Sequence, residues 1–95
     1  MKYEWDENKR AINIKKHDLD FADAHFVFED KNAVKYPDER NDYGEERFII
    51  VGGIKDVLVA SVCYCERNEK IRIISMRRAS KKERGTYYGN SPILH

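Results

Sequence analysis

The sequence lacks an excess of charge of either sign and has no long hydrophobic run. Its 95 residues carry 18 Lys and Arg against 17 Asp and Glu, so the formal net charge of +1 gives no overall attraction to nucleic acid. No stretch approaches the roughly 20 apolar residues of a membrane helix, and residues 1–6 have no apolar run behind a basic patch. We therefore expect a soluble, cytoplasmic protein.

Cysteine is also scarce, because the chain has only Cys63 and Cys65. They alternate with Tyr64 in an apolar stretch, so both point to one face of a strand, with poor geometry for a mutual disulfide. The sequence has no second ligand cluster for a zinc site, and it lacks a Gly-rich phosphate loop and a nucleophile elbow. We expect the thiols to lie in the core, and we expect no metal or cofactor.

A length of 95 residues suits one small domain, here residues 1–95. Periodicity and turn signals predict an α+β fold, a small antiparallel β-meander with two N-terminal helices and one C-terminal helix. Extended segments are expected at 3–5, 33–37, 47–52, 57–65 and 70–76, and helices after Asp6, Asp20 and Ser80. The strands are apolar on both faces, which predicts a sheet covered by the first two helices on one face and by the last helix or a partner on the other.

The most informative stretch is residues 71–83, which reads as a strand running directly into a helix. The two-residue period of a strand assigns its side chains to two faces, Ile71, Ile73 and Ser75 to one and Arg72, Ile74 and Met76 to the other. Arg72 therefore interrupts an apolar strand. It either serves a function or pairs with one of the many carboxylates, and both alternatives stay open.

The residues after this strand predict how the helix begins. Ser80 and Glu83 fit the S-x-x-E capping box. Arg77 and Arg78 then lie next to free N–H groups and the positive end of the helix dipole, where a phosphate is favoured. One interpretation is an anion site at this junction, and the other is a pair of solvated surface arginines.

Arginines on strands and one histidine are the candidates for chemistry. Arg47, Arg72 and Arg77 lie on strands of one small sheet, which can bring their guanidinium groups within reach of one phosphate. His17 ends the first helix, and an imidazole titrates near neutrality, as proton transfer from a ribose hydroxyl requires. Such a set suffices for metal-free RNA cleavage through attack of the 2′-hydroxyl. The alternative for His17 is an interaction with the helix dipole.

Four further residues are candidates for holding the flanking RNA: Lys16, Arg78, Lys81 and Tyr87. The ring of Tyr87 would stack on an unpaired base, although a packing role under the sheet is the alternative. Charge is distributed unevenly, because basic residues predominate in 67–84 and acidic residues in 38–46.

An ordered set of residues resembles the BrnT toxins over nearly the whole chain. The set is Glu4-Trp5-Asp6, Lys9, Asn13, Lys16-His17, Phe21, Ala24, Phe28, Asp38-Glu39-Arg40, Asp42-Tyr43-Gly44-Glu45-Glu46-Arg47, Gly52, Arg72-Ile73-Ile74-Ser75, Arg77, Ala79 and Glu83. The resemblance implies a type II toxin of bacteria or archaea, a ribonuclease with a RelE-like fold that inhibits translation. It implies a BrnA antitoxin in a 2:2 complex, whose ribbon-helix-helix domain binds operator DNA, so that this chain contacts DNA only through its partner.

Carried over by position, the family's functional residues are His17, Arg47, Arg72 and Arg77. Two positions depart from the family's pattern. Asp18 stands where Gly is common, and its charge is expected to raise the pKa of the neighbouring histidine. Met76 stands where a small residue is usual, and it is expected to narrow the site.

Two functions follow from the sequence. In the first, the chain is a metal-independent ribonuclease, in which His17 moves the proton and Arg47, Arg72 and Arg77 hold the phosphate and stabilise its developing charge. In the second, it is a non-catalytic binding module that acts only in an autoregulatory repressor complex with a DNA-binding antitoxin. The acidic segment 38–46 and the apolar sheet would serve as partner surface in either case.

Overall fold

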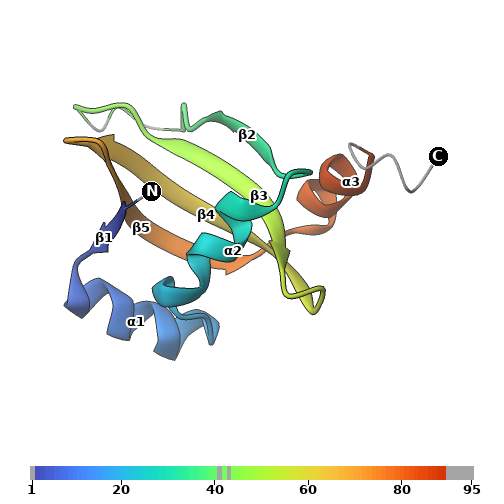
Figure 1. The fold of residues 1–95 in the computed structure, drawn as a ribbon, viewed down its shortest axis with the longest axis horizontal. Coiled ribbons are helices and arrows are strands. Elements are labelled where there is room, and N and C mark those ends of the chain that lie inside the picture. The colour runs from blue at the N-terminus through green and yellow to red at the C-terminus, as the bar shows by residue number, and fades with distance from the viewer. Residues whose placement is uncertain (1, 41, 43, 90–95) are drawn as a thin grey trace.

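The computed structural model describes residues 2–40, 42 and 44–89. Its α+β fold contains one sheet with the strand order β1-β5-β4-β3-β2 (Figure 1). The strands are β1 (Lys2–Trp5), β2 (Val34–Pro37), β3 (Phe48–Ile54), β4 (Leu58–Arg67) and β5 (Lys70–Arg78). The helices are α1 (Glu7–His17), α2 (Ala24–Glu29), which follows the 3-10 turn η1 (Phe21–Asp23), and α3 (Lys81–Gly89).

The strands β3, β4 and β5 form the predicted antiparallel meander. The turn between β4 and β5 consists of Asn68 and Glu69, whose φ angles of 50° and 65° are those that a two-residue hairpin turn requires to match the strand twist. At one edge, β2 pairs with β3 and ends at Pro37, which cannot donate to a ladder. At the other edge, β1 runs parallel to β5 and places Glu4 beside Arg72.

Helical segments pack on both faces of the sheet, but α1 contributes no residue to either apolar cluster, so the predicted cover of one face by the first two helices is not confirmed. On the first face, η1 and α2 pack on the larger core, in which Phe21 and Val27 meet Tyr64 and Ile73. Neighbouring residues of β3 point to the opposite, second face, where Tyr87 of α3 packs on a smaller cluster. That cluster consists of Ile49, Val51, Val59 and Ala79.

The predicted N-caps Asp6 and Asp20 begin α1 and the η1 turn, whereas α2 itself begins later, at Ala24. The Asp6 side chain accepts hydrogen bonds from the amides of Asn8 and Lys9 at 2.8 and 3.1 Å. The Asp20 side chain accepts from the Ala22 amide at 2.9 Å and so begins the η1 turn. Each carboxylate satisfies donors that a first helical turn leaves free.

Candidate functional site

A β-bulge at Ile74 changes which side chains of β5 share a face. Tyr64 of β4 lies opposite Ile73, whereas Cys63, the residue before Tyr64, lies opposite Ser75. Ile74 is therefore the extra residue, since a bulge sets two residues of one strand against one of its partner. The strict alternation predicted for this strand is wrong beyond Ile73.

The bulge brings Arg72 and Arg77 to the second face of the sheet. Arg72 lies opposite Cys65 and Arg77 lies opposite Ser61, and these two β4 residues point to the same face because they are four positions apart. Without a bulge, the two arginines would point to opposite faces. The expectation that Met76 narrows the site is also wrong, because its fully buried side chain lies in the core of the first face.

Arg47 lies on the second face beside the two cysteines, which are buried as predicted. Burial raises the pKa of Cys63 to about 11, with a further contribution from Asp38, while the charge of Arg47 acts in the opposite direction. Burial raises the pKa of Cys65 as well, and the charge of Arg47 again opposes it. The charge of Arg47 therefore acts on both thiols.

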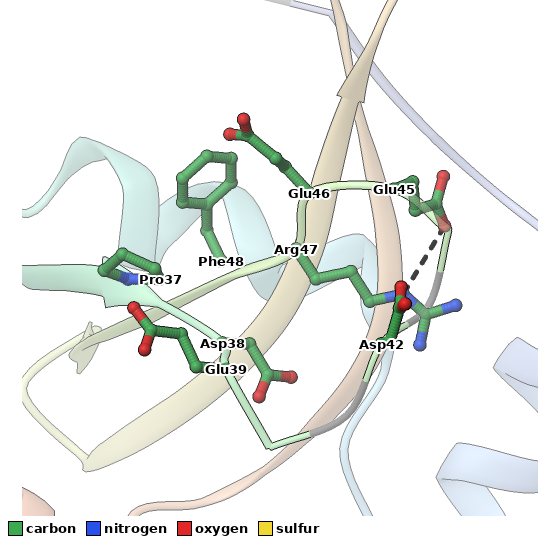
Figure 2. A pocket seen from close by; sticks show the side chains of 8 residues that line it. All are labelled: Pro37, Asp38, Glu39, Asp42, Glu45, Glu46, Arg47 and Phe48. Carbon is green, nitrogen blue, oxygen red and sulfur yellow. Dashed lines mark hydrogen bonds and ion pairs between the residues drawn. The ribbon is translucent and has the colours of Figure 1, made fainter.

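The side chain of Arg47 extends into a pocket of about 590 Å³ formed by the acidic segment (Figure 2). The pocket is lined by Pro37, Asp38, Glu39, Asp42, Glu45, Glu46, Arg47 and Phe48. Figure 2 shows the side chain of Arg47 pointing toward Glu45, and Arg47 Nε lies 3.4 Å from a Glu45 oxygen. Arg40 holds the pKa of the buried Asp38 carboxyl well below its usual range, so that carboxylate is ionised. The acidic motif also contains Tyr43, which lies outside the described residues.

Acidic side chains line the pocket that Arg47 extends into, and the phosphate contact predicted for Arg47 stays a prediction. A phosphate entering the acidic pocket would meet several negative charges within a few ångströms, which repel it. The structure therefore places Arg72 and Arg77 on a common surface, while Arg47 shares that face but points into the acidic pocket.

Arg72 is paired with a carboxylate, which is one of the two alternatives that the sequence leaves open for it. Its Nη1 donates to Glu4 Oε2 at 2.9 Å, between the parallel strands β5 and β1. Both side chains are about one third exposed, so the pair is partly solvated. Among the described residues, no acceptor contacts Arg72 Nε or Nη2, and these groups are available to a phosphate.

Arg77 is held by Glu83, whose carboxylate collects donors from several elements. Glu83 Oε1 accepts from Arg77 Nη1 at 2.7 Å and from the Ser80 amide at 2.8 Å. Oε2 accepts from Arg77 Nη2 at 3.1 Å and from the hydroxyls of Ser61 and Tyr36, both at 3.3 Å. Burial alone would raise the pKa of Glu83, but the hydrogen bonds from Arg77 and Ser80 outweigh it and lower the pKa to about 2.

These contacts confirm the capping box and change the interpretation of the strand-to-helix junction. The Ser80 hydroxyl accepts from the Glu83 amide at 3.2 Å, which completes the reciprocal cap. The anion position predicted there is filled by the carboxylate of Glu83 itself. Glu83 binds Arg77 through the two terminal nitrogens, Nη1 and Nη2, of the guanidinium group. In the described part of the chain, Arg77 Nε has no acceptor. The edge of the Arg77 guanidinium group that carries Nε therefore remains open.

His17 lies at the end of α1, and the buried Asn13 anchors this helix beside the bulge. Asn13 Oδ1 accepts from the Met76 amide at 3.1 Å, and its Nδ2 donates to the Leu19 carbonyl at 3.0 Å. Asp18 then ends α1 with a φ of 58°, in the left-handed conformation that Gly adopts most easily and Asp tolerates. Asp18, which stands where Gly is common in the family, therefore fits the backbone conformation at this position.

A hollow of about 180 Å³ lies between α1 and β5. It is lined by Lys9, Ile12, Asn13, Lys16, His17, Ile74 and Ser75. No carboxylate is among these residues, and in the described part of the chain Lys16 and His17 have no ion-pair partner. Because Ser75 stands between Arg72 and Arg77 on β5, the hollow places His17 at the rim of the surface that carries the two arginines.

The other three residues predicted to contact RNA differ in how far they are exposed to solvent. Arg78 and Lys81 are exposed at the start of α3. Tyr87 instead packs in the core of the second face, and its hydroxyl donates to Asp30 Oδ2 at 2.5 Å. Burial raises the pKa of Tyr87, as does Asp30, to about 12. Tyr87 therefore has a packing role in this structure, and the stacking role predicted for it stays a prediction.

Within the described residues, no three or more His, Cys, Asp or Glu side chains are grouped so as to hold a metal ion. None of the helices described is both long enough and apolar enough to cross a membrane.

Comparison with known proteins identifies relatives of the chain. Residues 5–83 match a family model described as "Ribonuclease toxin, BrnT, of type II toxin-antitoxin system". The fold is similar to the crystal structure of the Brucella abortus ribonuclease toxin BrnT, with a TM-score of 0.67 and 34% sequence identity. That match covers 85% of this chain and 99% of the Brucella chain. No curated protein matches the sequence.

Proposed function

Because the chain belongs to the BrnT family of ribonuclease toxins of type II toxin-antitoxin systems, we propose that it cleaves RNA on the second face of its sheet without a metal ion. The observation that carries this proposal is the bulge at Ile74, which sets Arg72 and Arg77 on one face with Ser75 between them. The hollow beside Ser75 adds an imidazole and Lys16 without a carboxylate.

The proposed reaction starts with proton transfer. His17 takes the proton from a ribose 2′-hydroxyl, and the oxygen attacks the adjacent phosphorus. The bond from phosphorus to the 5′-oxygen breaks, leaving a 2′,3′-cyclic phosphate on one fragment, and the departing oxygen takes a proton to become a 5′-hydroxyl. Arg72 and Arg77 stabilise the negative charge that develops on the phosphate oxygens, each through donors that its carboxylate partner leaves free. Lys16, Arg78 and Lys81 contact flanking phosphates.

Arg47 has a weaker role in this proposal than the sequence predicts for it. Its Nε lies 3.4 Å from a Glu45 oxygen and its side chain lines the acidic pocket, so we do not include it among the phosphate contacts of this proposal. The RNA path then runs from the α1 hollow across Arg72 and Arg77 toward the start of α3.

Membership of a type II system implies an antitoxin partner. We propose that this antitoxin is a BrnA-like ribbon-helix-helix protein in a 2:2 complex, that operator DNA is contacted only through it, and that the toxin inhibits translation in the cytoplasm. The RelE-like character of the fold belongs to the same proposal. These points follow from the family resemblance.

A non-catalytic partner-binding module remains the second candidate, and one observation favours it. Arg47, Arg72 and Arg77 are each paired with a carboxylate, so the second face carries less free positive charge than the sequence suggests. In that case the acidic segment and the sheet serve only as partner surface in an autoregulatory complex.

Expression of the chain alone, without its antitoxin, separates these functions. We expect the wild-type chain to stop the growth of a bacterial host, and the Arg72→Ala variant to permit growth at the same protein level. Arg67→Ala is the matched control, because Arg67 is an exposed arginine paired with Glu45 and should leave growth arrest intact. Normal growth with the folded wild-type chain would favour the binding module.

A further inference from the structure

A pocket of about 440 Å³ lies between the start of α3 and the strands β2 and β3. It is lined by Val34, Tyr36, Val51, Ser80, Lys82, Glu83 and Thr86. Its volume lies within the range of small-molecule sites, roughly 300 to 1,000 Å³. The nuclease mechanism above uses none of these residues except Glu83, which holds Arg77.

The lining combines an apolar floor with one aromatic wall. Val51 is nearly fully buried and Val34 is half-buried, and both point to the second face from paired positions on β3 and β2. Tyr36 is 36% exposed, so its ring offers a flat apolar surface to a ligand. Flat aromatic surfaces of this kind stack on unpaired bases in RNA-binding proteins.

The rim of the pocket is polar and comes from α3. Ser80 and Thr86 are exposed, and their hydroxyls already make one hydrogen bond each: Ser80 Oγ accepts from the Glu83 amide at 3.2 Å, and Thr86 Oγ1 donates to the Lys82 carbonyl at 3.3 Å. The Ser80 hydroxyl can still donate and the Thr86 hydroxyl can still accept. Lys82 is exposed and, in the part of the chain that the structure describes, has no carboxylate partner, so its ammonium group is available to a phosphate or a base carbonyl. A ligand with a flat ring and with hydrogen-bond donors and acceptors on the edges of that ring would fit this pocket.

Glu83 joins this pocket to the surface that carries Arg72 and Arg77. Its carboxylate accepts from the Tyr36 hydroxyl at 3.3 Å and from Arg77 at 2.7 Å, so one side chain lies between the aromatic wall and the phosphate-binding guanidinium group. A nucleotide whose phosphate contacts Arg77 therefore has its base close to Tyr36.

We propose that this pocket binds one unpaired nucleobase of the RNA substrate, next to the phosphate that is cleaved, and thereby selects the cleavage position. The proposal rests on the ribonuclease function above and extends it. Tyr36 stacks on the base, Thr86 and Ser80 contact its edge, and Lys82 holds the following phosphate.

Substitutions at the aromatic wall test the proposal through the cleavage pattern. Tyr36→Ala should raise the KM for a short RNA about tenfold, as expected for the loss of one stacked base, and should relax the base preference beside the cut. Tyr36→Phe keeps the ring, so it should keep both the preference and the KM. Tyr88→Ala is the matched control, because Tyr88 is an exposed tyrosine of α3 that does not line the pocket. Mapping the cut sites on an RNA that contains all base contexts gives the preference directly.

Nucleotide binding can be measured without relying on cleavage. The four ribonucleoside 3′-monophosphates are titrated into the wild-type protein while the methyl signals of Val34, Val51 and Thr86 are followed by NMR. Shifts of these signals that Tyr36→Ala weakens support the pocket, even if the protein cleaves no RNA and the ribonuclease function fails. Cleavage with an unchanged preference in Tyr36→Ala and no methyl shifts would overturn the nucleobase pocket and leave the ribonuclease function standing.

Discussion

Arg72 and Arg77 project from the same face of β5, although an odd number of positions separates them in the sequence. Strand alternation alone would place them on opposite faces, and the extra residue Ile74 reverses the alternation between them. The surface that carries both guanidinium groups is therefore produced by a local departure from regular strand geometry. Bulges of this kind re-aim side chains next to active sites.

Replacing His17 tests the proposed proton transfer. His17→Ala should lower kcat for RNA cleavage by at least about a hundredfold, the usual contribution of a general base, with little change in KM. His25→Ala is the control, because His25 lies on α2 and is paired with Glu29. An equal loss in both variants, or an unchanged kcat in His17→Ala, would argue against His17 as the base.

The Glu83 carboxylate should make stability depend on pH in the acid range. Its folded pKa of about 2 lies below the ordinary value of 4.5, so its contribution is fully present above pH 4.5 and is lost as the pH falls toward 2. The contribution is on the order of 3 kcal/mol. Glu83→Gln should therefore unfold more easily than the wild type at neutral pH, and the difference should shrink toward pH 2.

Chemical denaturation at several pH values measures this difference. Glu46→Gln is the matched control, since Glu46 is exposed and should give little change at any pH. A stability difference between wild type and Glu83→Gln that stays constant from pH 5 to pH 2 would show that the charge of Glu83 is not its source.

Asn13 should stabilise the fold and position His17 at the same time. Asn13→Ala leaves the Met76 amide without its acceptor in a buried position, which costs roughly 1 to 3 kcal/mol of unfolding free energy. Cleavage should also decrease, because α1 loses its anchor beside the bulge. Lys15→Ala, an exposed position on the same helix, should change stability by less than about 0.5 kcal/mol. Thermal unfolding and cleavage assays on the two variants provide the comparison.

Replacing Tyr87 should lower stability without lowering cleavage. Tyr87→Phe keeps the ring in the core but removes the hydroxyl that donates to Asp30, so the unfolding free energy should fall by about 1.5 to 3 kcal/mol. RNA cleavage by the folded variant should equal that of the wild type. A large rise in KM without loss of stability would instead restore the stacking role that the sequence suggests.

The sequence predicts those parts of the fold that depend on local signals. The caps at Asp6, Asp20 and Ser80 are confirmed because each acts within its own first turn. Alternating and continuous apolar runs predict the meander and its two covered faces. The sequence offers a carboxylate partner for Arg72 as one alternative, but it does not identify Glu4, because that pair depends on the parallel contact between β1 and β5, which no local pattern specifies.

The candidate site is predicted less completely than the fold. His17, Arg72 and Arg77 are identified by residue type and by resemblance, but their arrangement depends on the bulge at Ile74, and the sequence carries no evident signal for a bulge there. Glu83 is recognised as a cap, whereas its contact with Tyr36 requires β2 and α3 to meet on one face of the sheet. Tertiary contacts of this kind cannot be derived from spacing.

The most direct test of the account is cleavage of a purified RNA by the purified chain in the presence of EDTA, with analysis of the product ends. We expect cleavage to continue and to leave 2′,3′-cyclic phosphates and 5′-hydroxyls. Arg72→Ala should reduce the rate by at least about a hundredfold, and Arg67→Ala should retain it. Loss of cleavage in EDTA, or a wild-type rate for folded Arg72→Ala, would contradict a metal-independent centre built on Arg72 and Arg77.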